Sequence, residues 1–248
     1  MLGRPPLAIA FDCYGTLLDV TEEDFVAACG RILQRHAIEH DQRAFWKTWL
    51  EASRALAKEH GLDPEALHEA EPAFLPYKER WPQTFTRAFQ DAGVSADAVA
   101  AYEAFHDTLC RGVVYPDTLP ALGRLRPHFK LAVVSNADDD HLMQALTENG
   151  LTREGLFDFI LSSESARSYK PRRPIFEQAA ERFGVAVEDV LYVGDSPIAD
   201  VLGARSAGMP VAWLNRLHAD RPERVPAPDI ETPDLATLAD LLLDGVAG

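Results

Sequence analysis

Hydrophobic residues in the second half of the chain occur in short runs that alternate with segments of helical periodicity. The apolar runs are residues 131–136, 157–163, 189–195 and 209–215. The helical segments between them are residues 138–149, 174–183 and 198–207. An earlier run at 7–11 is also apolar without alternation, as expected of a strand covered on both faces. Strands separated by helices predict an α/β fold built on a doubly wound parallel sheet.

The segment between the first run and the second has a different character. Residues 20–113 are rich in Ala, Leu, Glu, Arg and aromatic residues at helical spacing, which predicts an insert of four or five helices. The predicted domains are therefore an α/β core of residues 1–19 and 114–248 and a helical insert of residues 20–113. The ends of the insert, near 19–21 and 112–116, are candidate hinges.

Proline and glycine interrupt the helical pattern of the insert at 61–64, 71–76 and 93–95. The stretch EPAFLPYKERWP, residues 71–82, combines prolines with aromatic residues and is interpreted as an irregular connection. The proline-rich stretch 219–233 is expected to loop over the surface before a last helix at 234–243.

Net charge and cysteine content narrow the possible partners. The formal charge of −15 repels nucleic acid and anionic membranes, so an anionic substrate would need local positive charge or a bound cation. No run approaches the about twenty apolar residues that span a bilayer. Three irregularly spaced cysteines suit a reducing cytoplasm. We expect a cytoplasmic monomer or homodimer that acts on a small anionic molecule.

Polar side chains that could take part in catalysis or binding follow the predicted strands. In open α/β sheets ligands bind beyond the carboxyl ends of the strands, so these side chains are expected to meet there. The candidates are Asp12, Thr16, Ser135, Asn136, Lys170, Asp195 and Asp200. Three carboxylates facing one lysine leave an excess of negative charge, which calls for a divalent cation.

Four motifs, in the same order along the chain, resemble those of a known superfamily. FDCYGTLLD, VVSNAD, SYKPRRPIF and VGDSPIADVLGARSAGM resemble those of the haloacid dehalogenase superfamily, and the helical insert takes the place of that superfamily's cap. The resemblance implies a Rossmann-like core with a helical-bundle cap. It also implies that Asp12 forms a covalent aspartyl intermediate, that Thr16 and Ser135 bind the substrate's anionic group or Asp12, and that Lys170 neutralises the carboxylates. Asn136, next to Ser135, is a further catalytic candidate.

The superfamily contains phosphatases and dehalogenases, and residues of this chain support each. By resemblance to the phosphatases, Mg²⁺ would be held by Asp12, the backbone carbonyl of Tyr14, Asp195 and Asp200. Family dehalogenases typically carry uncharged residues where Asp195 stands. A magnesium-dependent phosphatase of small phosphorylated metabolites is therefore the main prediction.

The alternative is a metal-independent 2-haloacid dehalogenase, which the first motif resembles. Tyr14 stands where typical phosphatases have an aspartate that protonates the leaving group, and a halide needs no such proton. Two features count against the dehalogenase: Phe176 replaces a usual tyrosine, and the nearest candidate for a carboxylate- or halide-binding arginine in the cap, Arg43, is offset by a few residues. A third hypothesis is a weakly catalytic metabolite-binding protein.

Candidate lid residues in the insert are aromatic or basic, and most are expected to hold the insert together. They are Phe45, Trp46, Trp49, Arg54, Tyr77, Lys78 and Trp81. Tyr14 and Arg43 complete the substrate-binding candidates.

Overall fold

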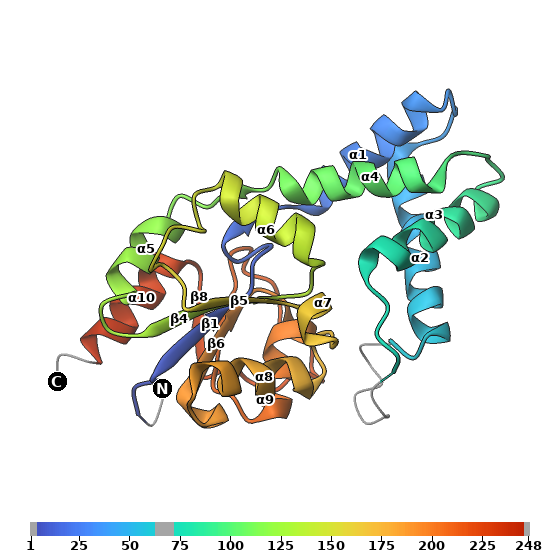
Figure 1. Cartoon of the computed structure of the whole chain (residues 1–248). Coiled ribbons are helices and arrows are strands. Elements are labelled where there is room, and N and C mark those ends of the chain that lie inside the picture. Colours follow the sequence, from blue (N-terminus) through green and yellow to red (C-terminus); the bar gives the residue numbers. More distant parts are fainter. Residues whose placement is uncertain (1–3, 63–71, 246–248) are drawn as a thin grey trace.

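A six-stranded parallel sheet forms the centre of the fold (Figure 1). The computed structural model describes residues 4–62 and 72–245. The strands in spatial order are β5 (Phe159–Ser162), β4 (Lys130–Ser135), β1 (Ala8–Phe11), β6 (Val190–Gly194), β7 (Val211–Leu214) and β8 (Ile230–Thr232). Neighbouring strands pair in parallel throughout. The predicted doubly wound α/β fold is confirmed.

Alternation along each strand divides its buried residues between the two faces of the sheet. In β1, Ile9 and Phe11 join one hydrophobic cluster, whereas Ala8 and Ala10 join the other. The first face is covered by α5 (Thr118–Leu125), α6 (Asp139–Glu148) and α10 (Leu235–Asp244). The second is covered by α8 (Arg173–Phe183), the π-helical turn η2 (Pro197–Leu202) and α9 (Gly203–Ala207). Two one-turn helices, α7 (Ser163–Ala166) and η1 (Val187–Asp189), complete this part.

In the described part of the predicted insert, four helices lie to one side of the sheet (Figure 1). They are α1 (Glu22–Arg35), α2 (Gln42–Glu59), α3 (Tyr77–Asp91) and α4 (Ala98–Cys110). They enclose their own aromatic cluster, in which Phe105 contacts Trp49 and Phe85. Two short antiparallel strands, β2 (Leu18–Asp19) and β3 (Val113–Val114), pair where the chain passes between the two parts. The domain boundaries at 19/20 and 113/114 remain a prediction. We call residues 1–19 and 114–248 the core and residues 20–113 the cap.

Two predictions about local structure were wrong. Helix α3 begins at Tyr77, inside the stretch interpreted as an irregular connection, and contains Pro82. A proline within a helix costs about 3 kcal/mol, which is offset because Trp81 and Phe85 are buried in the cap cluster. Strand β8 lies within the segment expected to be a loop; it is a three-residue edge strand, too short to show a periodic pattern.

No helix in the described part of the chain is both long and apolar enough to cross a membrane.

Candidate active site

The carboxyl ends of three adjacent strands bring the predicted side chains together. Asp12 follows β1, Ser135 ends β4, and Asp195 follows β6. Because β1 lies between β4 and β6, these three residues meet at the middle of one sheet edge. Lys170 reaches the same point from the segment between α7 and α8.

The carboxylate of Asp12 is held on one oxygen only. Its Oδ1 accepts hydrogen bonds from Ser135 Oγ at 2.9 Å and from Lys170 Nζ at 2.6 Å. Its Oδ2 accepts no hydrogen bond from the described residues. Two donors on Oδ1 fix the orientation of the group and leave lone pairs on Oδ2 for nucleophilic attack.

Lys170 joins two carboxylates in a fully buried ion-pair network. Its Nζ lies 2.6 Å from Asp12 Oδ1 and 2.7 Å from Asp200 Oδ1. Burial alone would lower the pKa of Lys170, but the adjacent carboxylates of Asp12 and Asp200 raise it well above its ordinary value. The lysine is therefore a permanent cation and not a proton donor.

Asn136 fixes the backbone that carries this lysine. Its side-chain amide donates to the Lys170 carbonyl at 3.0 Å and accepts from the Lys170 N–H at 2.8 Å. Asn136 is therefore a positioning residue for Lys170.

Two further carboxylates are held beside Asp12 at a high energetic cost. Burial, followed by the charges of Asp200 and Asp12, raises the pKa of Asp195 to about 7. Burial also raises the pKa of Asp200 to about 6 despite its contact with Lys170. Asp12, Asp195 and Asp200 each offer an oxygen within 4.8 Å of the others, a donor set that suits Mg²⁺.

Asp195 and Asp200 differ in the number of hydrogen bonds that their carboxylates accept. Both oxygens of Asp200 are bonded, Oδ1 to Lys170 and Oδ2 to the Ser196 N–H at 2.8 Å. Asp195 accepts on Oδ1 from Thr16 Oγ1 at 3.1 Å, and among the described residues nothing donates to its Oδ2. Thr16 thus bonds Asp195, whereas the sequence predicted Asp12 or the substrate as its partner.

Gly15 makes room for Asp195. Its φ of +82° lies in the left-handed region, and a Cβ at this position would stand 2.6 Å from Asp195 Oδ2. The glycine of the first motif is therefore required both by the turn after β1 and by the carboxylate that packs against it.

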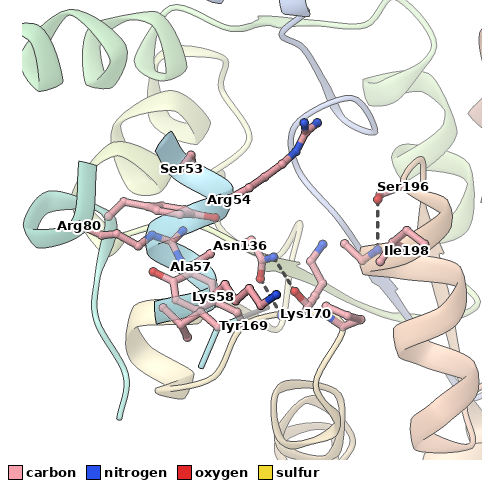
Figure 2. Close-up of a pocket in the computed structure, with 14 residues that line it drawn as sticks. Ser53, Arg54, Ala57, Lys58, Arg80, Asn136, Tyr169, Lys170, Ser196 and Ile198 are labelled. Carbon is pink, nitrogen blue, oxygen red and sulfur yellow. Dashed lines mark hydrogen bonds between the residues drawn. The ribbon is translucent and has the colours of Figure 1, made fainter. Parts of the chain in front are cut away.

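A cavity of about 560 Å³ lies between the cap and Lys170, whose Nζ pairs with Asp12 and Asp200; the three aspartates themselves are not among the residues that line it (Figure 2). Its core side is formed by Asn136, Tyr169, Lys170, Pro171, Ser196, Ile198 and Ala199. Its cap side is formed by Ser53, Arg54, Ala57, Lys58, Leu62, Tyr77 and Arg80. Apolar walls with a few polar groups at one end are typical of a small-molecule site.

Comparison with known proteins decides the family of this site. A family model of haloacid dehalogenase-like hydrolases matches residues 6–208. The chain belongs to the haloacid dehalogenase-like hydrolases. It is an enzyme of the hydrolase class, as the sequence predicted.

Individual relatives include both activities of the family. Haloacetate dehalogenase H-2 of Moraxella sp. is 28% identical over 95% of this chain and 97% of its own length. Phosphoserine phosphatase of Thermus thermophilus is 34% identical, over 64% of this chain and 63% of its own length. The solved structure of an L-2-haloacid dehalogenase has a TM-score of 0.77 at 22% identity, covering 96% of this chain and 99% of that one, which shows the shared fold.

Two residues predicted to bind substrate lie elsewhere in this hydrolase. The Tyr14 ring packs 6.2 Å from the His141 ring, and its buried hydroxyl has no hydrogen-bond partner among the described residues. Arg43 is exposed at the start of α2 and pairs with Glu23 at 2.5 Å. Eleven helical residues, about 16 Å, separate Arg43 from Arg54 on the cavity wall. The structure brings neither Tyr14 nor Arg43 to the cavity; Arg54 and Arg80 lie there instead.

Most of the candidate lid residues form the interior of the cap. Phe45, Trp46, Trp49 and Trp81 belong to the aromatic cluster, whereas Arg54 and Tyr77 line the cavity. Lys78 forms an ion pair with Glu164 of the core.

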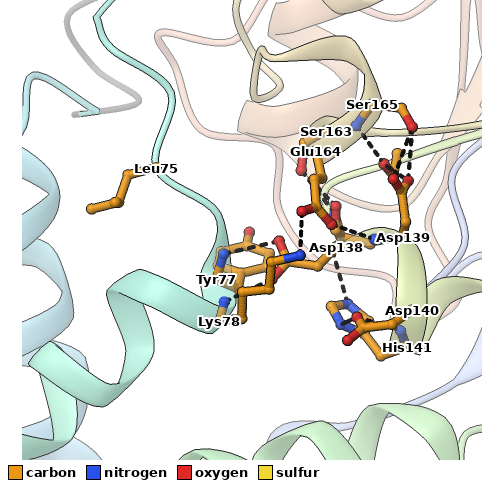
Figure 3. Close-up of polar contacts among 12 residues, drawn as sticks. Leu75, Tyr77, Lys78, Asp138, Asp139, Asp140, His141, Ser163, Glu164 and Ser165 are labelled. Atoms are coloured by element: carbon orange, nitrogen blue, oxygen red, sulfur yellow. Dashed lines mark hydrogen bonds and ion pairs between the residues drawn. The ribbon is translucent and has the colours of Figure 1, made fainter.

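Sequence reasoning missed the contact that positions α3 (Figure 3). Asp138, at the start of α6, accepts hydrogen bonds from the backbone N–H groups of Tyr77 at 2.9 Å and Lys78 at 2.7 Å. A second tie runs from Tyr169 Oη to the Leu75 carbonyl at 2.9 Å. The aspartate run 138–140 indicated a helix start, but nothing in it pointed to a second helix 60 residues away.

Proposed function

We propose that this hydrolase is a 2-haloacid dehalogenase that converts a 2-haloacid into a 2-hydroxy acid through an ester with Asp12. The net reaction consumes one water and releases one halide ion and one proton. Support comes from the environment of Tyr14 and from the haloacetate dehalogenase that is similar over nearly the full length of both chains. This is the alternative of the two reactions weighed from the sequence.

In the first step, Asp12 Oδ2 attacks the carbon that carries the halogen. The new C–O bond forms as the carbon–halogen bond breaks, and the bonding pair leaves with the halide. Ser135 and Lys170 hold Oδ1, so Oδ2 is directed at the substrate by hydrogen bonds at the opposite oxygen. Lys170 also offsets the negative charge of an approaching carboxylate.

The proposal depends most on Tyr14, the residue two positions after Asp12, and on its capacity to donate a proton. An alkoxide leaving from a phosphate ester needs a proton, and supplying it contributes about 10²–10⁴ in rate. The Tyr14 phenol is a poor substitute because burial, assisted by Cys13, raises its pKa well above its ordinary value. Its ring lies 6.2 Å from the ring of His141, and Tyr14 is not among the residues that line the cavity. A halide leaves without a proton and does not need this group.

In the second step, water attacks the carbonyl carbon of the Asp12 ester. The product leaves with the oxygen that attacked it, and the water oxygen remains in the Asp12 carboxylate. Asp195 is the better general base of the two neighbouring aspartates, because its Oδ2 has no described donor and its pKa is about 7. It takes one proton from the attacking water and returns it to the departing alkoxide, and the second water proton is released to solvent as the Asp12 carboxylate reforms. Asp200 instead stays bonded on both oxygens and holds Lys170 in place.

A second candidate function is the magnesium-dependent phosphatase that the sequence favoured. Its support is the carboxylate of Asp195, which joins Asp12 and Asp200 in an oxygen donor set. With the backbone carbonyl of Tyr14 these residues would hold Mg²⁺, which when bound would screen Asp12 from the phosphate oxygens. The phosphatase relative aligns with less of the chain than the dehalogenase does.

Parallel assays separate the two reactions. Purified protein is given chloroacetate, 2-chloropropionate or p-nitrophenyl phosphate, with Mg²⁺ or with EDTA, and Asp12→Asn is the blank. Metal-independent halide release that the variant lacks supports the dehalogenase. Phosphate release that requires Mg²⁺, without halide release, refutes it in favour of the phosphatase. Silence on all three substrates leaves two interpretations to be separated next, a narrower substrate range and the binding protein of the third hypothesis.

A single-turnover experiment in heavy-oxygen water tests the ester itself. With enzyme in excess, mass spectrometry should find the heavy oxygen in the peptide that contains Asp12 and not in the 2-hydroxy acid. Direct attack of water on the substrate would place the label in the product and would contradict the covalent mechanism.

We also propose that the protein resides in the cytoplasm as a monomer or homodimer. All three cysteines are buried and unpaired, which a reducing compartment preserves. Sedimentation equilibrium at micromolar concentration would decide the oligomeric state.

A further inference from the structure

The cap wall of the cavity carries three cations. Arg54 and Lys58 stand one helical turn apart on α2, and Arg80 lies on the neighbouring α3 (Figure 2). Asn136 and Lys170 lie on the opposite, core side. The cavity therefore has three cations on its cap side, apart from Lys170 on its core side, whose charge is paired with Asp12 and Asp200.

These cap cations have no carboxylate partner among the described residues, although the chain is strongly acidic. Arg87 on α3 and Arg43 on α2 each pair with a glutamate of the cap, at 2.7 Å and 2.5 Å. No such pair forms at Arg54, Lys58 or Arg80 within residues 4–62 and 72–245. Like charges four residues apart destabilise a helix by about 0.2–0.5 kcal/mol. A ligand anion between them would relieve this repulsion.

Arg80 is the most constrained of the three. Its guanidinium carbon lies 4.8 Å from the Tyr77 ring centre and 5.0 Å from that of Tyr169. Its Nε is buried, and no residue in the described part of the chain forms a hydrogen bond with it. A buried donor without a partner is costly, so an acceptor supplied by a ligand would be bound favourably.

The size of the cavity also exceeds what the smallest haloacids fill. A three-carbon haloacid has six non-hydrogen atoms, and at about one water's share of 30 Å³ per atom these fill about a third of the space. The cavity holds about 560 Å³. The remainder extends toward the cap cations.

We propose that the substrate carries a second anionic group, bound by Arg54, Lys58 and Arg80, at the end of the molecule remote from Asp12. This rests on the dehalogenase proposed above and narrows its substrate to 2-halo dicarboxylic acids of medium chain length. One carboxylate lies beside the reacting carbon near Lys170. The other reaches the cap end, where its binding favours productive orientation of the chain between them.

The test compares two six-carbon acids that differ in the second carboxylate. Halide release from 2-bromohexanedioate and 2-bromohexanoate is measured in the wild type, in Arg54→Gln/Lys58→Gln and in Arg80→Met. The wild type should favour the diacid by about tenfold or more in kcat/KM, as expected for hydrogen bonds to a charged group. In both variants this ratio should fall toward one, mainly through KM. Arg87→Gln, an exposed arginine outside the cavity, is the matched control and should keep the wild-type ratio.

Calorimetry with unreactive acids keeps the inference separate from the reaction. Hexanedioate should bind the wild type about tenfold more tightly than hexanoate does, and the double variant should lose that preference. If halide release fails for both bromoacids while this preference stands, the dehalogenase is refuted and the anion site is supported. Equal binding of the two acids by the wild type, or a preference that the double variant retains, would overturn the inference. Thermal melts confirm that each variant is folded.

Discussion

Replacing Asp138 tests whether one core carboxylate positions the cap. Its side chain is fully buried and accepts from the backbone N–H groups of Tyr77 and Lys78, the first two residues of α3. Helix N-termini leave such groups without partners inside the helix. Pro76, which precedes them, has no side chain able to accept a hydrogen bond. Asp138→Ala therefore leaves two donors of α3 without their acceptor.

The expected loss of stability follows from this geometry. Removing a capping side chain costs about 0.5–2 kcal/mol, and two bonds to a buried carboxylate place this case near 2 kcal/mol. For a chain of this length that lowers the melting temperature by about 4–8 °C. Since Tyr77 and Arg80 line the cavity just after the freed N-terminus, KM should also rise.

The loss should depend on pH in a definite direction. Burial raises the pKa of Asp138 to about 6 in the folded protein. The folded state therefore holds its proton more tightly than the unfolded state, so the stability that Asp138 contributes is largest in acid and is lost as pH rises through 6. The deficit of Asp138→Ala should be about 1 kcal/mol larger at pH 5 than at pH 7.

Urea unfolding followed by tryptophan fluorescence measures the deficit, and hydrogen exchange reports on the amides of Tyr77 and Lys78. Asp139→Ala is the matched control, because it removes a carboxylate from the same turn whose partners, Ser162 and Ser165, belong to the core. Equal deficits in the two variants, with unchanged exchange at both amides, would refute the role of Asp138 as the anchor of α3.

Three further variants test the site and its surroundings. Lys170→Met should abolish turnover and, by leaving two buried carboxylates uncompensated, cost about 3–5 kcal/mol in urea unfolding; an active or fully stable variant would contradict its assigned role. Gly15→Ala should reduce kcat while costing about 1–2 kcal/mol, since it strains a positive φ and displaces Asp195; unchanged kinetics would argue against a function for that carboxylate. Burial lowers the pKa of His141 to about 4, so the unfolded state takes up its proton first and stability falls from pH 6.5 toward 4. In urea unfolding, His141→Gln should remove about 3 kcal/mol of this acid-induced loss in the free energy of unfolding.

The core and its catalytic end were predictable because both depend on local patterns. Runs such as 131–136 are buried on both faces, and a parallel sheet places their carboxyl ends at one edge, so Asp12, Ser135 and Asp195 could be brought together from strand order alone. Helix α5 has no comparable signal, since Pro120 and Gly123 interrupt its short apolar pattern.

The cap was less predictable because its contacts are remote in sequence. Which arginine faces the cavity depends on the rotation of α2 about its own axis, and that is set by packing of Trp46 and Trp49 against α4 and not by spacing from the first motif. The sequence therefore suggested Arg43 as the substrate-binding arginine of the cap, whereas Arg54 lines the cavity. The helix that carries Arg80 was not predicted because Pro82 lies within it. The destabilisation of a helix by an internal proline is offset here only by tertiary contacts.

The charge balance around Asp12 explains how one set of residues can suit either reaction. The proposed attack requires an ionised Asp12, yet a cluster of three carboxylates with one lysine would repel an anionic substrate. Burial and the charges of Asp200 and Asp12 raise the pKa of Asp195 to about 7, which favours its protonated form and lowers that repulsion without a metal. A bound Mg²⁺ would achieve the same end by drawing Asp195 into its ionised form. The carboxylates therefore do not distinguish the reactions, and we infer the distinction from the group two residues after Asp12. Burial raises the pKa of the Tyr14 phenol, which makes it a weak proton donor for an alkoxide leaving from a phosphate ester, whereas a halide leaves without a proton.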